Sequence, residues 1–439
     1  MRRSVIILLF GMASIPALAA EPDGLTLRPG FHASVVADSL GPIRHLAVRG
    51  NGDIYVSTPV DKVNKGAGII ALRLDANHKA RQVRHFSTVD GGTGIRFYRG
   101  ELYASSPTSV YRFRFNGDEL IPTTQPEVIV DDMPAAHLGF QRVNRPIAFD
   151  AKGDLYVALD GSGNLCTSQS YPVGSPPVGT NLVGLKPCPD LGKRAGVWEY
   201  KADKTNQKFP ADGVQLATGI RDIDTLGWSP ADKNLYGIMH GRDDSQKLWP
   251  AIFSEETGEQ VADEMHRITK GTNFGWPYTY YDGVRHIRLV APEYGGNGKT
   301  VAPAGIYSTP VLTFQSPREA PMDIAFYTGD AFPKAYHDGA FIVLHGTRGK
   351  GGSVIFVPFN RSGKAGVPQT FAEGFAGYDD QTASTPGRRA KYRPSSVAVG
   401  PDGALYIADS QMGRIWRIAY SEPSKRKVAA KDGSKGAHP

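Results

Sequence analysis

One short unit recurs six times along the chain of 439 residues and constrains the fold more than any other feature. Each copy consists of a short apolar strand, a turn rich in Gly, Asp or Asn, and a second apolar strand that carries an aromatic residue. Gly and Asp supply the backbone angles of a tight turn, and the alternating apolar residues on both sides complete a hairpin. The copies begin at Leu46, Ile95, Ile147, Leu226, Ile324 and Val397.

The spacing of the copies predicts how the hairpins assemble. They lie about 70 residues apart, whereas a typical propeller repeat has ~40–50 residues, so several loops between strands must be long. A closed ring of four-stranded blades leaves no long exposed sheet edge. We therefore predict an all-β, six-bladed β-propeller over residues 21–420 with long inter-strand loops. The longest of these loops are expected over residues 160–195, 243–263, 278–313 and 348–389.

The two ends of the chain differ from the repeat region. A basic head at Arg2 and Arg3, an apolar run and a small-residue exit at Ala19–Ala20 predict a secretory signal peptide over residues 1–20. Residues 421–439 are basic and poor in apolar side chains, which predicts a disordered tail. We therefore expect a periplasmic or secreted protein with no transmembrane segment. Much of the net charge of +7 lies at these ends, and export argues against a nucleic-acid partner.

The only two cysteines are Cys166 and Cys188. An even number of cysteines in an exported chain favours one disulfide, here closing a loop rich in Gly, Pro and Ser. Such a bond stabilises the fold by about 3 kcal/mol on loop-entropy grounds. No Cys-x-x-Cys-His motif is present, so the chain attaches no c-type haem.

Three segments carry candidate chemistry. In 219–224, Arg221 offers an always-charged planar group that suits a carboxylate or a quinone oxygen, although a surface pair with Asp222 or Asp224 stays open. The segment 240–244 offers backbone carbonyls and carboxylates to a hard cation such as calcium, or is ordinary turn chemistry. The aromatic run 271–277 is expected to pack structurally. Phosphate-loop, zinc-site and serine-hydrolase motifs are absent from the sequence.

Together these segments resemble the soluble glucose/sorbosone dehydrogenases that depend on pyrroloquinoline quinone (PQQ), which are exported six-bladed propellers. The matching stretches are 219–229, 240–241, 263–277 and 391–393. The resemblance spans about residues 25–418. The paired cysteines resemble those of the sorbosone-type branch.

The resemblance implies roles for single residues. Arg221 matches the arginine that contacts the quinone oxygen of PQQ, and Asp222 stands where the glucose branch usually has Asn. Gly241 and Arg242 match the pair whose main-chain oxygens bind the calcium ion. PQQ and calcium are therefore the implied cofactors.

Further cations and the catalytic base are also implied by the resemblance. Lys391 and Arg393 match residues that hold the PQQ carboxylates, and Arg348 matches a further cationic contact. The family's base is a histidine three or four residues before the basic residue that precedes the third repeat, here Arg145. That window holds no histidine, and His137 lies eight residues before Arg145, so it requires a local insertion to act as the base.

These features predict an exported quinoprotein dehydrogenase that oxidises an aldose or a sugar aldehyde by hydride transfer to PQQ. Since it carries no haem motif, it would pass electrons to a quinone or a separate cytochrome. Two other functions stay open. The missing histidine favours a non-catalytic propeller that binds sugar, whereas a calcium-dependent lactonase would need Glu, Asn or Asp ligands around the channel, a set not evident in the sequence.

Overall fold

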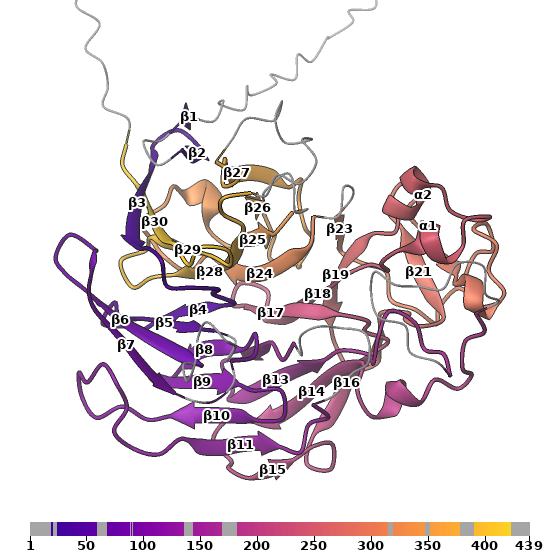
Figure 1. The fold of residues 1–439 in the computed structure, drawn as a ribbon, viewed down its shortest axis with the longest axis horizontal. Coiled ribbons are helices and arrows are strands. Elements are labelled where there is room, and N and C mark those ends of the chain that lie inside the picture. Colours follow the sequence, from indigo (N-terminus) through magenta and orange to yellow (C-terminus); the bar gives the residue numbers. More distant parts are fainter. Residues whose placement is uncertain are drawn as a thin grey trace, which may run out of the picture.

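The computed structural model describes residues 19–20, 24–58, 68–87, 89, 91–135, 144–168, 182–314, 319–346, 352–377 and 390–422. Within these residues the chain forms six β-sheets arranged around a common centre (Figure 1). This arrangement confirms the predicted all-β, six-bladed propeller.

The first three blades follow each other along the chain, and the strands of each blade run from the channel outwards in the following order. Blade 1 contains β4 (Leu46–Val48), β5 (Ile54–Ser57), β6 (Ile69–Leu74) and β7 (Ala80–Ser87). Blade 2 contains β8 (Ile95–Tyr98), β9 (Glu101–Ser105), β10 (Val110–Phe113), β11 (Glu127–Asp131) and β15 (Gln207–Lys208). Blade 3 contains β12 (Ile147–Phe149), β13 (Asp154–Leu159), β14 (Gly196–Lys201), β16 (Val214–Thr218) and β20 (Thr272–Asn273).

The last three blades complete the ring. Blade 4 contains β17 (Ile223–Ser229), β18 (Asn234–Met239), β19 (Asp263–Ile268) and β23 (Leu312–Phe314). Blade 5 contains β24 (Pro321–Phe326), β25 (Ala340–Leu344), β26 (Ser353–Val357), β27 (Gln369–Glu373), β2 (Thr26–Leu27) and β1 (Ala19–Ala20). Blade 6 contains β28 (Pro394–Val399), β29 (Leu405–Asp409), β30 (Ile415–Tyr420) and β3 (Phe31–Ala37).

The ring is closed by strands from both ends of the chain. The early strand β3 pairs antiparallel with the late strand β30, and Phe31 lies opposite Tyr420. The inner strands β4, β8, β12, β17, β24 and β28 contact one another in that order, and β28 contacts β4. Every blade therefore has a neighbour on both sides, which leaves no gap in the ring.

The six predicted hairpins are the two innermost strands of the six blades, as β4–β5 and β28–β29 illustrate. The aromatic residue of each copy is buried, and each belongs to a different hydrophobic cluster between neighbouring blades. The recurring aromatic is therefore the residue that joins one blade to the next. These residues are Tyr55, Tyr103, Tyr156, Tyr236, Phe341 and Tyr406.

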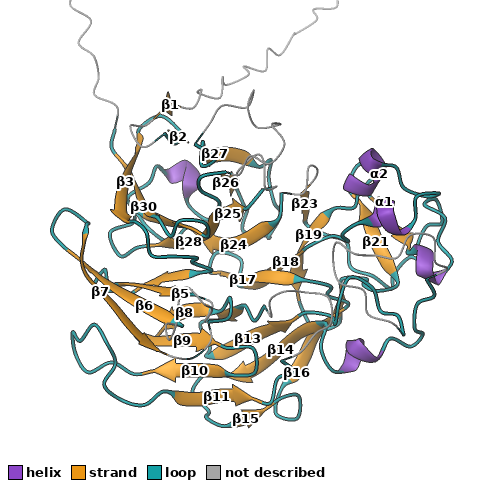
Figure 2. Ribbon diagram, in the orientation of Figure 1, coloured by secondary structure: helices purple, strands orange, loops and turns teal. Residues whose placement is uncertain are grey.

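The long excursions carry the few helices. The helices α1 (Ser245–Leu248) and α2 (Glu255–Glu259) gather with the hairpin β21 (Thr279–Asp282) and β22 (Ile287–Val290) beyond β18 and β19 (Figure 2). Single 3₁₀ turns cover Pro189–Gly192, Pro292–Tyr294 and Lys334–Tyr336. The expectation of one long loop over 348–389 was wrong, because the outer strands β26 and β27 of blade 5 lie in that range.

The predicted signal peptide and tail lie almost wholly outside the described residues, which include Ala19–Ala20, Ser421 and Glu422. Ala19 and Ala20 form β1 and pair with Leu27 and Thr26. None of the helices in the described ranges has the length and apolar character needed to cross a membrane.

Candidate functional site

Charged and polar side chains from several blades converge at one end of the central channel. They lie just before or at the start of an inner strand, or just after the strand paired with it. Antiparallel pairing brings these positions together, as Ile223 opposite Met239 and Pro321 opposite Leu344 show. We call this the charged end of the channel. Its central residues are Arg44, Asn144, Arg221, Asp222, Asp224 and His240.

Arg221 is held at the charged end by three neighbours. It is only 1% exposed, and its Nε donates to Asn164 Oδ1 at 2.9 Å. One Nη donates to the Gly241 carbonyl at 2.6 Å, and the other donates to the Asp243 carboxylate. Asp222 lies farther away, with 3.9 Å between Arg221 Nη1 and Asp222 Oδ2. Arg221 is thus a buried, fixed cation and not part of a surface pair.

A polar network beside Arg221 joins blades 1, 3 and 4. Asn144 Nδ2 donates to Asp222 Oδ1 at 2.9 Å. Arg44 donates to Asp224 Oδ1 at 2.7 Å and to Asn144 Oδ1 at 3.2 Å. The His240 ring has Nε2 2.8 Å from the Pro321 carbonyl, so Nε2 carries a proton and donates to that oxygen.

The carboxylates around His240 control its charge. Its Nδ1 lies 3.7 Å from Asp222 Oδ2 and 3.9 Å from Asp224 Oδ2. Burial by itself lowers the pKa of His240, but the interaction with the Asp222 carboxylate 3.7 Å away, aided by the charges of Asp263 and Asp224, raises that pKa to about 10. His240 is therefore a cation at neutral pH.

The same interactions act on the two acids that face Asn144. Burial raises the pKa of Asp222, but the interaction with His240 and the charge of Arg221 outweigh it, so that pKa lies below its ordinary value. Burial and the nearby Asp222 charge raise the pKa of Asp160 well above its ordinary value. Asp160 is 1% exposed, and it accepts hydrogen bonds from the backbone N–H groups of Ile223 and Asn144 at 2.9 and 3.2 Å.

The charged end offers two places for a cation. Asp222, Asp224 and His240 each contribute one ligand atom, and these atoms lie within 4.8 Å of one another. A metal ion there would compete with the proton on His240. The second place is the Gly241 carbonyl, which accepts one hydrogen bond from Arg221, and a carbonyl oxygen has a second lone pair.

The Arg242 side chain has a structural partner. Its guanidinium donates to both carboxylate oxygens of Glu293, at 2.8 and 2.5 Å, and to the Pro277 carbonyl at 2.7 Å. The two side chains are 3% and 0% exposed. This buried pair ties the excursion that contains β21 and β22 to the end of β18. Sequence reasoning missed the pair, because the resemblance assigned Arg242 a role only through its main chain.

Lys391 and Arg393 lie at the start of β28. Arg393 donates from Nη2 to the Gly346 carbonyl at 2.5 Å and from Nε to the His345 carbonyl at 3.3 Å. Lys391 is exposed, with its ammonium 5.1 Å from the centre of the Tyr392 ring. Because both residues precede an inner strand, they belong to the same end of the channel as Arg221.

Two predicted site residues, His137 and Arg348, lie outside the described residues. The chain is described again from Asn144, which is part of the network. The predicted disulfide between Cys166 and Cys188 is confirmed, and both cysteines are buried.

Five residues of the charged end were not singled out from the sequence: Arg44, Asn144, Asp160, Asn164 and Glu319. Arg44 and Asn144 lie two and three residues before an inner strand, and Arg221 and Asp222 lie two and one residues before theirs, so a position rule based on the repeat could have found them. Glu319 stands just before β24, and burial together with the charge of Asp263 raises the pKa of Glu319 to about 7.

The fold and the charged end define a class of protein: a six-bladed propeller with a buried arginine and carboxylates at one end of its channel. The chain belongs to the TrAA12-like family, whose model matches residues 25–169 and 194–421.

Relatives with sequence similarity include the aldose sugar dehydrogenase YliI of Escherichia coli, which is 24% identical over 406 residues, 91% of this chain and 90% of that protein. An uncharacterised protein of Synechocystis is 27% identical over 44% of this chain and 38% of its own length. One from Borreliella burgdorferi is 24% identical over 47% of this chain and 49% of its own length. The chain thus spans less than half the length of these two relatives.

Solved structures share the fold. The holo form of the PQQ domain of pyranose dehydrogenase from Coprinopsis cinerea has a TM-score of 0.68 and 16% identity, covering 92% of this chain and 100% of that one. A calcium structure of the carbohydrate-active enzyme family AA12 from Trichoderma reesei has a TM-score of 0.67 and 16% identity, covering 93% and 98%.

Proposed function

We propose that this protein is an exported, PQQ-dependent oxidoreductase that oxidises an aldose or a hydrated sugar aldehyde. Membership of the TrAA12-like family supports the proposal, as does the shared fold with the PQQ domain of a pyranose dehydrogenase. The observation that carries it is the position of Arg221. A fixed, buried guanidinium next to the Gly241 carbonyl places a permanent cation beside a candidate calcium ligand.

The residues present fit the cofactor. PQQ has three carboxylates and a quinone, so it needs several cations in fixed places. Arg221, the His240 cation, Arg393 and Lys391 supply them from blades 4 and 6. Calcium prefers oxygen ligands, and the second lone pair of the Gly241 carbonyl is one. The Arg242 carbonyl is the other main-chain ligand in the proposal.

Each residue has a role that follows from its chemistry. PQQ, when bound, supplies the two-electron oxidant that the side chains of a protein lack. Arg221 donates hydrogen bonds to an oxygen that gains negative charge, and such preorganised donors are effective because they need no reorganisation. Lys391 and Arg393 hold the cofactor carboxylates, with Arg348 as a further contact. His137 takes the proton from the sugar hydroxyl.

Asp222 belongs to this proposal as a positioning residue. Its carboxylate receives a hydrogen bond from Asn144 and keeps His240 protonated. Asp222 places a negative charge where the glucose branch usually has the neutral amide of Asn. The His240 cation balances this charge. The paired cysteines favour the sorbosone-type branch, whose substrates are sugar aldehydes. Electrons would leave to a quinone or a separate cytochrome.

The proposal is tested by adding PQQ and calcium to the purified apo-protein and measuring cofactor binding by calorimetry and dye reduction with a panel of aldoses. We expect tight PQQ binding and sugar-dependent dye reduction. Arg221→Lys should lower kcat about 10²–10³-fold, the usual cost of losing a donor to a developing oxyanion. The matched control, Arg285→Lys, changes an arginine of the outer β21–β22 hairpin and should leave kcat unchanged. Failure of the wild-type protein to bind PQQ would overturn the proposal.

The base is tested separately. His137→Gln should abolish turnover while PQQ binding persists, and Glu319→Gln is its comparison because the pKa of Glu319, about 7, also suits a general base. Loss of activity only in Glu319→Gln would reassign the base.

A second candidate function is a non-catalytic propeller that binds sugar. The absence of a histidine from the expected window before Arg145 favours it. Tight PQQ binding without turnover of any sugar in the panel would support this function over the enzyme.

A further inference from the structure

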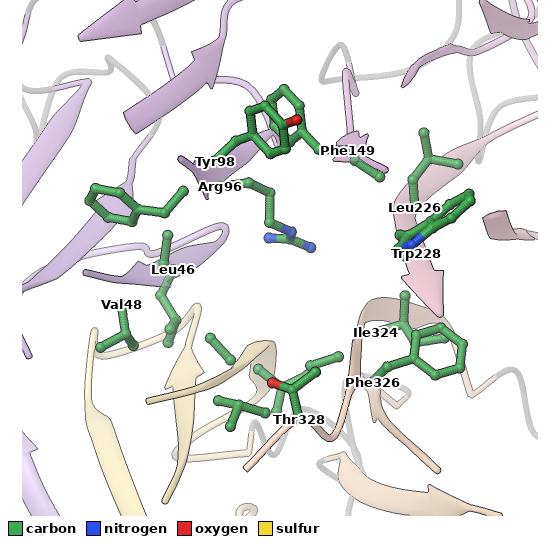
Figure 3. A pocket seen from close by; sticks show the side chains of 18 residues that line it. Leu46, Val48, Arg96, Tyr98, Phe149, Leu226, Trp228, Ile324, Phe326 and Thr328 are labelled. Carbon is green, nitrogen blue, oxygen red and sulfur yellow. The ribbon is translucent and has the colours of Figure 1, made fainter. Parts of the chain in front are cut away.

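A cavity lies in the channel at the end opposite the charged end. Its volume is about 340 Å³, within the range of small-molecule sites. All six inner strands line the cavity, mostly through their later residues, whereas Arg44, Asn144, Arg221 and Asp222 of the charged end precede those strands. We call it the apolar end of the channel. Labelled residues around it are Leu46, Val48, Arg96, Tyr98, Phe149, Leu226, Trp228, Ile324, Phe326 and Thr328 (Figure 3).

A buried polar belt separates the two ends. Asp323 is 0% exposed and accepts a hydrogen bond from Arg96 Nη2 at 2.6 Å. It also accepts one from Ser396 Oγ at 2.6 Å and one from Thr225 Oγ1 at 3.2 Å. These partners come from blades 2, 6 and 4, so Asp323 of blade 5 binds side chains across the channel. A ligand at the apolar end would therefore occupy a site distinct from the proposed PQQ site.

Flat rings line the apolar end. Tyr98 and Phe149 stack with ring centres 4.7 Å apart, and Trp228 lies parallel to Tyr156 with centres 6.2 Å apart. In Figure 3 the Tyr98–Phe149 pair lies on one side of the cavity and Trp228 on another. Rings held in place by stacking present fixed flat surfaces, which favour a planar ligand.

Arg96 is the charged residue in the lining of this cavity, and its guanidinium points into the middle of the opening (Figure 3). An arginine has five N–H donors. Two donate to Asp323 and to the Ile95 carbonyl, and the other three have no hydrogen-bond partner among the described residues. Because Asp323 already balances the charge of Arg96, the cavity offers donors without a net positive charge. This combination favours a neutral acceptor over an anion.

We infer that the apolar end is a binding site for a neutral, planar aromatic molecule with a carbonyl oxygen, that is, a quinone-type ring. The ring packs against Trp228 and the aliphatic lining, and the carbonyl oxygen accepts hydrogen bonds from Arg96. The inference does not depend on PQQ binding at the charged end.

The test uses the full chain without added PQQ and three probes of one ring size: 1,4-naphthoquinone, 1-naphthoate and naphthalene. Both cysteines are in the disulfide, so the quinone finds no free thiol to modify. Binding is measured by calorimetry and by quenching of tryptophan fluorescence, to which Trp228 contributes. We expect saturable binding of naphthoquinone. Naphthalene should bind at least tenfold more weakly, because it lacks a partner for the charged donor.

Three variants locate the site. Ala325→Phe fills the cavity from its lining and should weaken naphthoquinone binding at least tenfold. Arg96→Lys keeps the charge beside Asp323 but removes the planar donor set, and should weaken binding by a similar factor. The matched control, Arg114→Lys, changes an exposed arginine of the same blade that does not line the cavity, and should bind as the wild type does.

The inference is overturned if naphthoquinone binds Ala325→Phe and Arg96→Lys as tightly as the wild type, or does not bind the wild type at all. Binding of naphthoate as tight as that of naphthoquinone would overturn the assignment to a neutral ligand. Far-UV circular dichroism and thermal melting establish whether each variant is folded. If either Ala325→Phe or Arg96→Lys does not fold, the other still tests the inference.

Discussion

The buried pair of Arg242 and Glu293 gives the sharpest prediction of stability. Glu293→Gln removes the negative charge but keeps the shape of the side chain, and leaves the Arg242 guanidinium, 3% exposed, without its counter-charge. Removing one partner of such a pair costs about 3–5 kcal/mol, because the remaining ion stays buried. Replacing both residues, as Arg242→Met with Glu293→Leu, removes both charges and should cost clearly less than either single change.

Urea denaturation of the wild type, Glu293→Gln, the single variants Arg242→Met and Glu293→Leu, and the double variant measures these costs. The wild type, Arg242→Met, Glu293→Leu and the double variant form a double-mutant cycle. The control is Lys247→Met, which breaks the pair of Lys247 with Asp244 in the same excursion. Lys247 is 51% exposed, so its loss should cost less than about 1 kcal/mol. A cost for Glu293→Gln no larger than that of Lys247→Met would refute the reasoning. So would a double variant whose loss equals the sum of the two single losses.

Three further outcomes are expected. Because the folded-state pKa of His240, about 10, lies above its ordinary value of 6.5, its contribution to stability should be complete below pH 6.5 and fall as the pH rises to about 10. Urea denaturation at several pH values in this range should show that the unfolding free energy of the wild type falls with pH more steeply than that of His240→Gln. An equal dependence on pH in the two proteins would contradict the assignment. Replacing Cys166 and Cys188 together by Ala should cost about 3 kcal/mol of unfolding free energy, given the separation of 22 residues; no change in the urea midpoint would argue against it. Asp222→Asn should lower the pKa of His240, seen by NMR as a ring titration whose midpoint moves to lower pH, and an unchanged midpoint would exclude Asp222 as the cause.

Much of the fold was predictable because its information is local. Most hairpins are specified by a short turn and by apolar residues nearby in the chain, and only the copy in blade 5 has a long connection between β24 and β25, so the six copies could be found one by one. Their number and regular recurrence then predicted a closed ring. The disulfide was predictable because the chain offers only one pair of cysteines.

The outer strands were less visible. β26 and β27 lie in a range expected to be a loop. Blade 6 is completed by β3, which is separated from β30 by almost the whole chain. Such pairings depend on which sheet edge remains unpaired when the ring closes. The residues next to a strand in the sequence do not indicate which edge that is.

The site, like the fold, has one part that was predictable from the sequence and another that was not. The amino-acid sequence by itself determined the hairpin unit, the ring and a few chemically distinctive residues such as Arg221, because these depend on residues close together in the chain. Only the tertiary structure decided that Arg44 would meet Asp224, 180 positions later, and that Glu293 would neutralise Arg242. The physical reason is that a buried charge is stable only when an opposite charge or a hydrogen-bonding group lies beside it. In the closed ring these partners come from blades and loops that are far apart in the sequence but adjacent in space.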